Sequence, residues 1–216
     1  FTGPVVNDER ALTSEADLRT VYRPAGQPAL DKQIDHLDDH CVAFLAHAPL
    51  AMLATADANG RCDVSPKGGP PGFARALGPS LLAFGDLAGN NRLDSFTNLT
   101  DNPGVGLLFL IPGIDETLRV NGTGRVTTDA DVLTACAIDG VSFRTALVVD
   151  VEEAYIHCAK AFRRAGAWTP EAWPDTSDLP TPACMLRDHI GLDLSAEEVG
   201  EVLEDGYRRT LWRSGG

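Results

Sequence analysis

Strand-like segments occupy the middle of the chain, where short apolar or alternating runs are separated by turn residues. They cover residues 50–56, 61–67, 81–86, 105–111, 116–128 and 145–151. The sequence Asp57-Ala58-Asn59-Gly60 predicts a hairpin between the first two runs. Because helices do not alternate regularly with these strands, the pattern excludes a doubly wound parallel sheet. It favours an antiparallel barrel with peripheral helices.

Helical spacing of apolar residues lies mainly on either side of the strands. Residues 30–48 carry apolar side chains three and four positions apart, which predicts one long helix. Shorter helices are predicted over residues 92–99, 129–138, 155–164, 184–190 and 195–208. We expect one domain over residues 1–216, made of an N-terminal arm at 1–29, the helix at 30–48, the barrel at 50–152 and a helical and extended segment at 153–216.

Residues 116–128 allow two interpretations. The dipeptide Asn121-Gly122 has the chemistry of a tight hairpin turn. Gly122 and Gly124 also fit one long strand in which they mark a bulge or a sharp bend. The residues alone leave both interpretations open.

The balance of charge limits the partners of the protein. The chain carries 18 Lys and Arg residues against 31 Asp and Glu residues, a formal net charge of -13. Such a chain repels nucleic acid and anionic membranes unless its cations are clustered. No run approaches the about 18 apolar residues of a membrane-spanning helix. We therefore expect neither nucleic acid nor a membrane as a partner, and any phosphate must be held by a local site.

The cysteines and histidines point away from a disulfide framework and from a metal. Five cysteines are widely spaced and form no CxxC pair, which is typical of a reduced, cytoplasmic protein. The amino end also lacks the features of a signal peptide. His36 and His40 are spaced to share one face of the predicted helix. Because no third ligand is evident, we favour a solvated acidic face over a metal site.

Three groups of polar residues are candidates for binding an anionic ligand. Asn90, Asn91 and Arg92 follow a glycine at a predicted helix start, where free N–H groups and a guanidinium suit a phosphate. Ser65 and Lys67 end a strand beside a glycine-rich loop, and Thr117 and Arg119 share one strand face. Each group also has a structural interpretation: a capped helix with an exposed arginine, a solvated lysine and a polar cross-strand pair.

The order of these motifs resembles a known family. Across about residues 45–128 the chain resembles the pyridoxamine 5'-phosphate oxidase-like FMN-binding split barrels. Residues 155–164, with Trp168, are similar to a bacterial branch described only as FMN-dependent enzymes. The resemblance implies a mainly β fold with peripheral helices (α+β): a six-stranded antiparallel split β-barrel of the FMN-binding type. It also implies a homodimer with FMN at the subunit interface, and one long bent strand over residues 116–128.

The resemblance assigns roles to individual residues. It implies that cofactor contacts come from two strands, from the phosphate-binding loop and from the strand near the flavin ring; the residues are Ser65, Lys67, Phe84, Gly85, Asn90, Asn91, Arg92, Thr117 and Arg119. It also suggests a second wall of the site, made by His157, Lys160, Arg163 and Trp168. It assigns no catalytic residue.

Two departures from the family bear on the activity. The oxidases carry Arg-Lys where this chain has Asn91-Arg92, so one cation is lost. Residues 207–213 also lack the Arg-x-His-type motif with which the vitamin B6 oxidases hold the substrate phosphate. We therefore expect an FMN-dependent oxidoreductase that acts on an unidentified small molecule, with NAD(P)H as electron donor, rather than a true pyridoxamine phosphate oxidase. The alternative is a non-catalytic module for flavin, deazaflavin or haem, with His157 or His189 as the candidate haem ligand.

Overall fold

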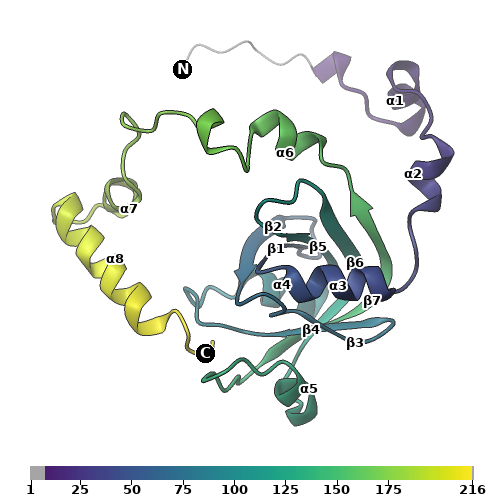
Figure 1. Cartoon of the computed structure of the whole chain (residues 1–216). Helices are drawn as coiled ribbons and strands as arrows, with labels where there is room; N and C mark the ends of the chain where they lie inside the picture. Colours follow the sequence, from purple (N-terminus) through teal and green to yellow (C-terminus); the bar gives the residue numbers. More distant parts are fainter. Residues whose placement is uncertain (1–7, 216) are drawn as a thin grey trace. The chain divides into compact units, whose positions relative to one another are not determined.

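The computed structural model in Figure 1 describes residues 8–215, and the chain divides into two compact units between Gln33 and Ile34. The first unit holds the 3-10 helix η1 (Asp8–Arg10) and the helices α1 (Glu15–Val21) and α2 (Gln27–Asp31), none of which has a buried residue. Ser14 caps α1 in a capping box with Asp17, as its spacing suggests. The rest of the predicted arm, residues 1–7, lies outside the described residues.

The long helix predicted over residues 30–48 is wrong in its middle part. Helix α3 spans only Asp39–His47, and the carboxylate of Asp38 caps it by accepting from the backbone N–H of Cys41 at 2.8 Å. Before it, Ile34 forms an antiparallel bridge with Ala154 of the last strand. The apolar residues of segment 30–48 therefore serve two purposes: Ile34 contacts a strand, and Cys41 and Leu45 form the buried face of α3. His36 precedes α3, so it does not share a helical face with His40.

The second unit is built on one antiparallel sheet, with the strand order β2-β1-β5-β6-β7-β4-β3. Its strands are β1 (Leu50–Ala56), β2 (Cys62–Gly68), β3 (Arg75–Gly78), β4 (Leu81–Gly85), β5 (Gly104–Leu110), β6 (Thr117–Thr127) and β7 (Ala146–His157). The prediction of six strands is corrected to seven. The missed strand, β3, is four residues long and has a register shift against β4, so it gives almost no alternation to detect.

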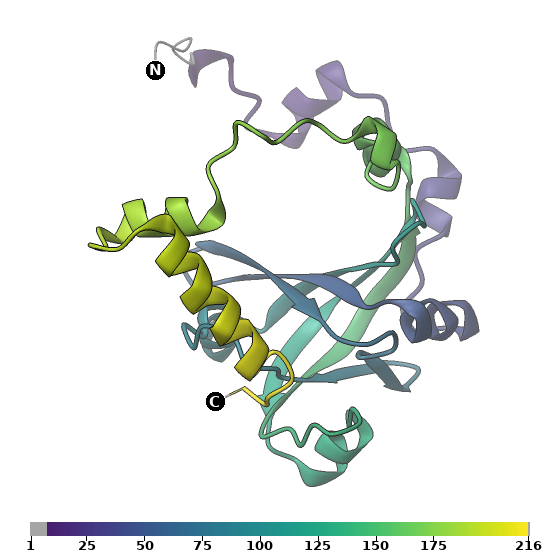
Figure 2. The ribbon, with the colours of Figure 1, turned by 60° about the vertical axis from the view of Figure 1, so that its left-hand side comes forward.

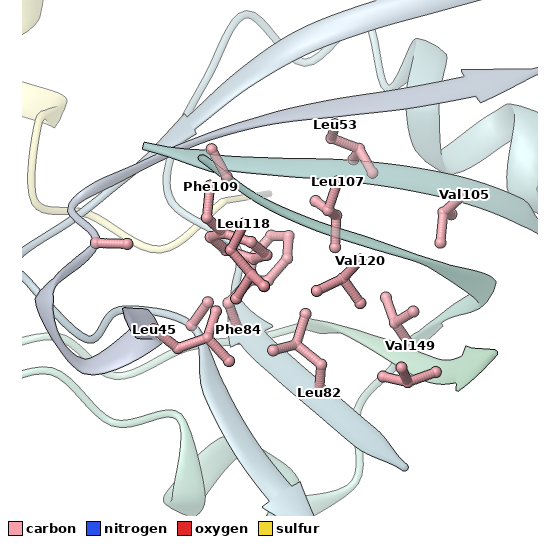
Figure 3. Close-up of a cluster of buried hydrophobic side chains, with 14 of the residues drawn as sticks. Leu45, Leu53, Leu82, Phe84, Val105, Leu107, Phe109, Leu118, Val120 and Val149 are labelled. Atoms are coloured by element: carbon pink, nitrogen blue, oxygen red, sulfur yellow. The ribbon is translucent and has the colours of Figure 1, made fainter. Parts of the chain in front are cut away.

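The sheet curls around a shared apolar core (Figure 3). Leu53 of β1 and Leu82 of β4 belong to the same buried cluster although three strands separate them in the sheet. Phe73 joins the two sides, with its ring 5.6 Å from that of Phe84 and 6.5 Å from that of Phe109. Burial of these side chains is the main source of stability for the unit.

Strand β6 is one long strand, as the family resemblance predicted, and the hairpin interpretation is wrong. Its pairing with β7 shifts register between Asn121 and Gly122. A Cβ at Gly122 would collide with the carbonyl oxygen of Asp150, so the bulge requires glycine at this position. The bulge lets an eleven-residue strand bend around the core.

The hairpin predicted at residues 57–60 is confirmed. Asp57 accepts from the backbone N–H groups of Asn59 and Arg61 at 2.8 Å, and Gly60 takes a φ of +80°. The returning strand β2 lies at an edge of the sheet. This position explains how β2 tolerates Pro66, which has no N–H to donate.

The remaining helices surround the sheet and extend the C-terminal part. They are α4 (Asp94–Asp101), α5 (Ala130–Ala135), α6 (Lys160–Ala165), the 3-10 helix η2 (Pro170–Ala172), α7 (Pro182–Ile190) and α8 (Ala196–Thr210). The helix predicted over residues 155–164 is wrong at its start, because β7 continues to His157 against β6. No helix in residues 8–215 combines the length and apolar character needed to cross a membrane.

Candidate functional site

A polar recess of about 320 Å³ lies between the edge strand β2, the loop after β4 and the first turn of α4. The recess brings together the predicted residues from the strand and from the loop, namely Ser65, Lys67, Asn90, Asn91 and Arg92. Residues two apart on β2 share a face, so Asp63 joins Ser65 and Lys67 in the lining. The alternation of one strand therefore places three polar side chains in the recess.

A second recess of about 450 Å³ adjoins the first. Phe84 and Gly85, predicted beside the cofactor, line this recess together with Phe73 and Trp212. The two recesses share several residues, of which Lys67 is the cation. A polar space thus continues into an aromatic one, with an ammonium group at the junction.

The C-terminal tail contributes the outer part of the second recess. Helix α8 leads the chain back to the sheet (Figure 2), where Ser214 forms an antiparallel bridge with Leu87. The backbone N–H of Ala88 donates to the carbonyl of Arg213 at 2.8 Å, and that of Gly215 donates to Asp86 at 2.9 Å. These bonds hold the preceding Trp212 at the recess, about 130 residues further along the chain than Phe84.

The loop that carries Arg92 has a strained backbone. Asn91 and Leu93 have backbone φ values of 56° and 59°, in a region that residues other than glycine rarely adopt. The backbone N–H of Arg92 donates to Oδ1 of Asn90 at 3.1 Å, which closes the turn. Helix α4 begins at Asp94, so Arg92 precedes the helix by two residues rather than opening it. Strain of this kind is concentrated at functional sites in proteins.

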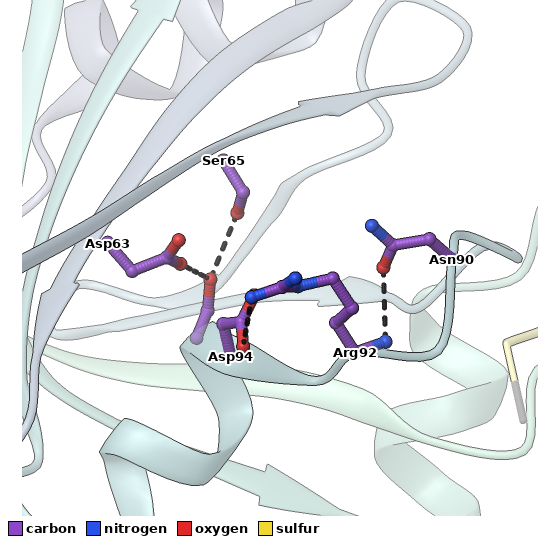
Figure 4. A network of polar contacts seen from close by, with 6 residues as sticks. Asp63, Ser65, Asn90, Arg92 and Asp94 are labelled. Carbon is purple, nitrogen blue, oxygen red and sulfur yellow. Dashed lines mark hydrogen bonds and ion pairs between the residues drawn. The ribbon is translucent and has the colours of Figure 1, made fainter. Parts of the chain in front are cut away.

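The polar side chains of the first recess form two hydrogen-bonded groups, one around Arg92 and one around Ser95 (Figure 4). Nε of Arg92 donates to Oδ2 of Asp94 at 2.7 Å, and Nη2 lies 3.5 Å from Oδ1. Ser95, which is 5% exposed, donates through Oγ to a carboxylate oxygen of Asp63. Oγ of Ser65 lies 3.0 Å from Oγ of Ser95. Strand β2 and helix α4 are therefore joined through side-chain oxygens.

Hydrogen bonding and burial in the recess shift the pKa values of two groups. The hydrogen bond to Asp94 raises the pKa of Arg92, which stays charged. Burial raises the pKa of Asp86, and the nearby charge of Lys67 opposes that shift. Nζ of Lys67 lies 5.3 Å from the ring centroid of Phe96, within cation–π range.

Thr117, Arg119 and His157 form a second cluster, on paired positions of β6 and β7. Thr117 is 2% exposed and lies opposite His157. Nη1 of Arg119 donates to the hydroxyl of Tyr155 at 3.0 Å, and the rings of Tyr155 and His157 are stacked. None of these residues lines either recess.

Two of the other three residues predicted for the second wall, Arg163 and Trp168, hold a loop in place. Nε of Arg163 donates to Asp115 at 2.9 Å, and Nε1 of Trp168 donates to the carbonyl of Ile114 at 2.9 Å. Lys160 is exposed at the start of α6. These three residues line neither recess, and two of them fix the segment between β5 and β6.

A family model for pyridoxamine 5'-phosphate oxidase matches residues 37–158, which is more than half of the chain. The chain belongs to this family. The match begins just before α3 and ends just after β7, so it takes in the whole sheet of this pyridoxamine 5'-phosphate oxidase family member. No curated protein matches the chain.

Several solved structures are similar to this family member. HupZ of Group A Streptococcus is 17% identical, with a TM-score of 0.45, over 55% of this chain and 92% of its own. An FMN-binding protein of Syntrophomonas wolfei is 12% identical, with a TM-score of 0.40, over 53% of this chain and 81% of its own. HutZ, the haem storage protein of Vibrio cholerae, is 14% identical, with a TM-score of 0.37, over 56% of this chain and 94% of its own.

Sequence reasoning missed several residues that line the recesses of this family member. They are Asp63, Asp86, Asp94, Ser95, Phe96, Leu211 and Trp212. Asp63 could be found from its spacing of two from Ser65, because both lie on one strand face. Trp212 had no local signal, since only the pairing of the tail with residues 86–88 brings it to the recess.

Proposed function

We propose that the chain binds FMN across the two adjoining recesses and acts as an FMN-dependent oxidoreductase on a small molecule, with NAD(P)H as electron donor. The observation that carries the proposal is the continuity of a polar recess and an aromatic one through Lys67. FMN has this form, with a phosphate at one end and a flat ring at the other. Membership of the pyridoxamine 5'-phosphate oxidase family supports the same cofactor.

The donor groups of the polar recess suit a phosphate. Lys67 and Arg92 supply charged donors, Asn90 and Asn91 supply amides, and the first turn of α4 has N–H groups without partners inside the helix. Each charge-assisted hydrogen bond contributes about 1.5–3 kcal/mol. Two such bonds and a buried ring can reach the about 8 kcal/mol of micromolar binding.

The aromatic recess suits the flavin ring. Phe84 and Phe73 line the recess from the apolar core, and Trp212 of the tail lines it as well. When bound, the flavin supplies the transfer of electrons between donor and substrate. The protein residues bind and orient the ring and keep water from it, while Lys67 holds a positive charge between ring and phosphate.

We also propose that the curled sheet is the split barrel of the family and that two copies form a homodimer. The outward face of the sheet carries a row of paired residues, Met52, Leu108, Arg119 and Tyr155, which are partly exposed. Such a row of methionine, leucine, arginine and tyrosine side chains suits a twofold interface. In this proposal the partner subunit completes the cofactor site with its second cluster, Thr117, Arg119 and His157, and with the other second-wall residues, Lys160, Arg163 and Trp168.

The visible absorption spectrum of the purified protein tests the proposal. We expect a yellow protein that releases FMN on denaturation and whose flavin is bleached by NAD(P)H without oxygen. A colourless protein that FMN does not reconstitute would overturn the proposal. Bound flavin that no nicotinamide donor reduces would favour a non-catalytic module. A haem Soret band would favour a haem protein, with His157 or His189 as ligand.

Substitution of Arg92 tests where the phosphate binds. Arg92→Ala should weaken FMN binding about tenfold, because one charge-assisted bond is lost, and should leave riboflavin binding unchanged. The measurement is quenching of flavin fluorescence. Arg209→Ala is the matched control, since Arg92 and Arg209 are 71% and 66% exposed and each lies 2.7 Å from an aspartate on the same chain. Equal FMN affinity in the two variants would contradict the assignment.

A further inference from the structure

The strongest donor of the polar recess is already bound by a carboxylate. Arg92 donates through Nε to Asp94 at 2.7 Å, and its Nη2 lies 3.5 Å from the second carboxylate oxygen (Figure 4). Two-point pairing of this kind is the way in which a guanidinium binds a phosphate. Asp94 is also the first residue of α4, at the helix end that favours a negative charge. Its carboxylate thus takes two of the interactions that the recess offers to an anion, the Arg92 guanidinium and the start of the helix.

The hydroxyl groups of Ser65 and Ser95 also donate towards a carboxylate, that of Asp63. The hydrogen of Ser95 Oγ is donated to Asp63, so in the Ser65–Ser95 contact of 3.0 Å the donor is Ser65. Neither serine then has a hydrogen left for a ligand. A second carboxylate, that of Asp63, is therefore the final acceptor of these hydrogen bonds.

The charged residues of the recess indicate that a phosphate would compete with carboxylates for the cations. Among the described residues that line it, Lys67 and Arg92 are cations, whereas Asp63, Asp86 and Asp94 are carboxylates. A phosphate that carries about two negative charges at pH 7 would enter a space that is already acidic. Arg92 is the cation within ion-pair distance of Asp94, so Asp94 is the carboxylate that a phosphate would displace first.

We propose that Asp94 determines the ligand specificity of this site: its carboxylate holds Arg92 in competition with phosphate and keeps the affinity for phosphate-bearing ligands low. The inference rests on the proposed function in taking the phosphate of FMN as the natural competitor. It follows that the wild-type protein prefers FMN over riboflavin, which lacks the phosphate, by a smaller factor than a protein without the Asp94 carboxylate would.

The change that tests this is Asp94→Asn, which keeps the size of the side chain and removes its charge. We expect FMN and inorganic phosphate to bind about tenfold more tightly, from the lost ion pair and the lost repulsion. Riboflavin affinity should not change. Asp205→Asn is the matched control, because Asp205 is 49% exposed against 46% for Asp94 and pairs with Arg209 at the same 2.7 Å. Asp94→Ser provides a second uncharged variant.

Titration calorimetry with FMN, riboflavin and inorganic phosphate separates the outcomes. Tighter FMN and phosphate binding in both Asp94 variants, with Asp205→Asn unchanged, supports the inference. An unchanged or weaker FMN affinity in the variants, where the wild type binds FMN, overturns it and makes Asp94 a residue that orients Arg92. Phosphate binding that tightens in a protein without FMN affinity overturns the proposed function alone. No binding of FMN or of phosphate by any variant overturns both.

Discussion

The interior of the curled sheet and the polar recess beside it are held together by different interactions. In the interior, Leu118 and Val120 of β6 are fully buried and pack in one apolar cluster. In the recess, Leu93 is 53% exposed, the backbone on both sides of Arg92 has positive φ, and the side chains are held by ion pairs and hydrogen bonds. Burial of apolar side chains stabilises the interior. In the recess, a loop with positive φ values positions polar side chains that are held by ion pairs and hydrogen bonds.

Because the two regions rely on different interactions, the interior determines the stability of the fold, whereas the recess determines which ligand binds. Apolar burial contributes about 25 cal/mol per Å² and dominates folding. Exposed ion pairs such as Arg92–Asp94 contribute about 0–1 kcal/mol to stability, although the same groups can decide which anion binds. We therefore expect interior substitutions to change the free energy of unfolding, and recess substitutions to change ligand affinity.

The largest effect is expected from one leucine substitution made in both regions. Leu118→Ala should lower the free energy of unfolding by about 2–5 kcal/mol, because it leaves a cavity in the core. Leu93→Ala should lower it by no more than about 0.5 kcal/mol, as for other exposed positions. Urea unfolding followed by circular dichroism measures both. Similar losses in the two variants would mean that the recess loop carries a share of the core.

A glycine pair gives a smaller and sharper contrast. Gly122→Ala should destabilise the protein by about 3 kcal/mol, since the new Cβ meets the carbonyl oxygen of Asp150 and the bulge must shift. Gly89→Ala adds a Cβ with no atom within 4 Å, in the loop of the recess, and should change stability by less than about 1 kcal/mol. Thermal unfolding of the two variants compares them. A destabilised Gly89 variant would show that the loop is packed more tightly than its contacts indicate.

The interior is also the part that the sequence predicts best. Short apolar or alternating runs between turn residues located six of the strands, because these runs match the buried faces of the sheet. The same reasoning missed β3, whose four residues follow a loop rich in glycine and proline. It also extended a helix back to residue 30, because Ile34 is apolar for its contact with Ala154 of β7 rather than for a helix face.

The recess could be predicted only in part. Arg92 and Lys67 were found because a cation beside a glycine-rich loop has a recognisable chemistry. Asp94 was not found, since its importance lies in a 2.7 Å contact with Arg92 that two left-handed residues create. Trp212 depends on the return of the tail to Leu87, and no local pattern encodes that pairing. Long-range contacts and backbone strain are thus what the sequence leaves out.

The smallest effect tests whether the recess contributes to stability through charge. Burial raises the pKa of Asp86 above its ordinary value, so the folded state binds the proton more tightly than the unfolded state does. The stabilising contribution of this group is then complete at pH values below about 4, the ordinary pKa, and is lost as the pH rises through the raised pKa. Asp86→Asn cannot titrate, and should be slightly more stable than the wild type at pH 7.

The gain from Asp86→Asn should disappear as the pH falls below about 4, which urea unfolding at several pH values would reveal. Asp57→Asn is the control of opposite sign. The backbone N–H groups of Arg61 and Asn59 lower the pKa of Asp57, so its contribution is present at pH 7 and is lost as the pH falls through that lowered value. This variant should lose stability at pH 7. If both variants had the same pH dependence, the charge in the recess would have no cost to folding, and the contrast with the apolar interior would rest on packing alone.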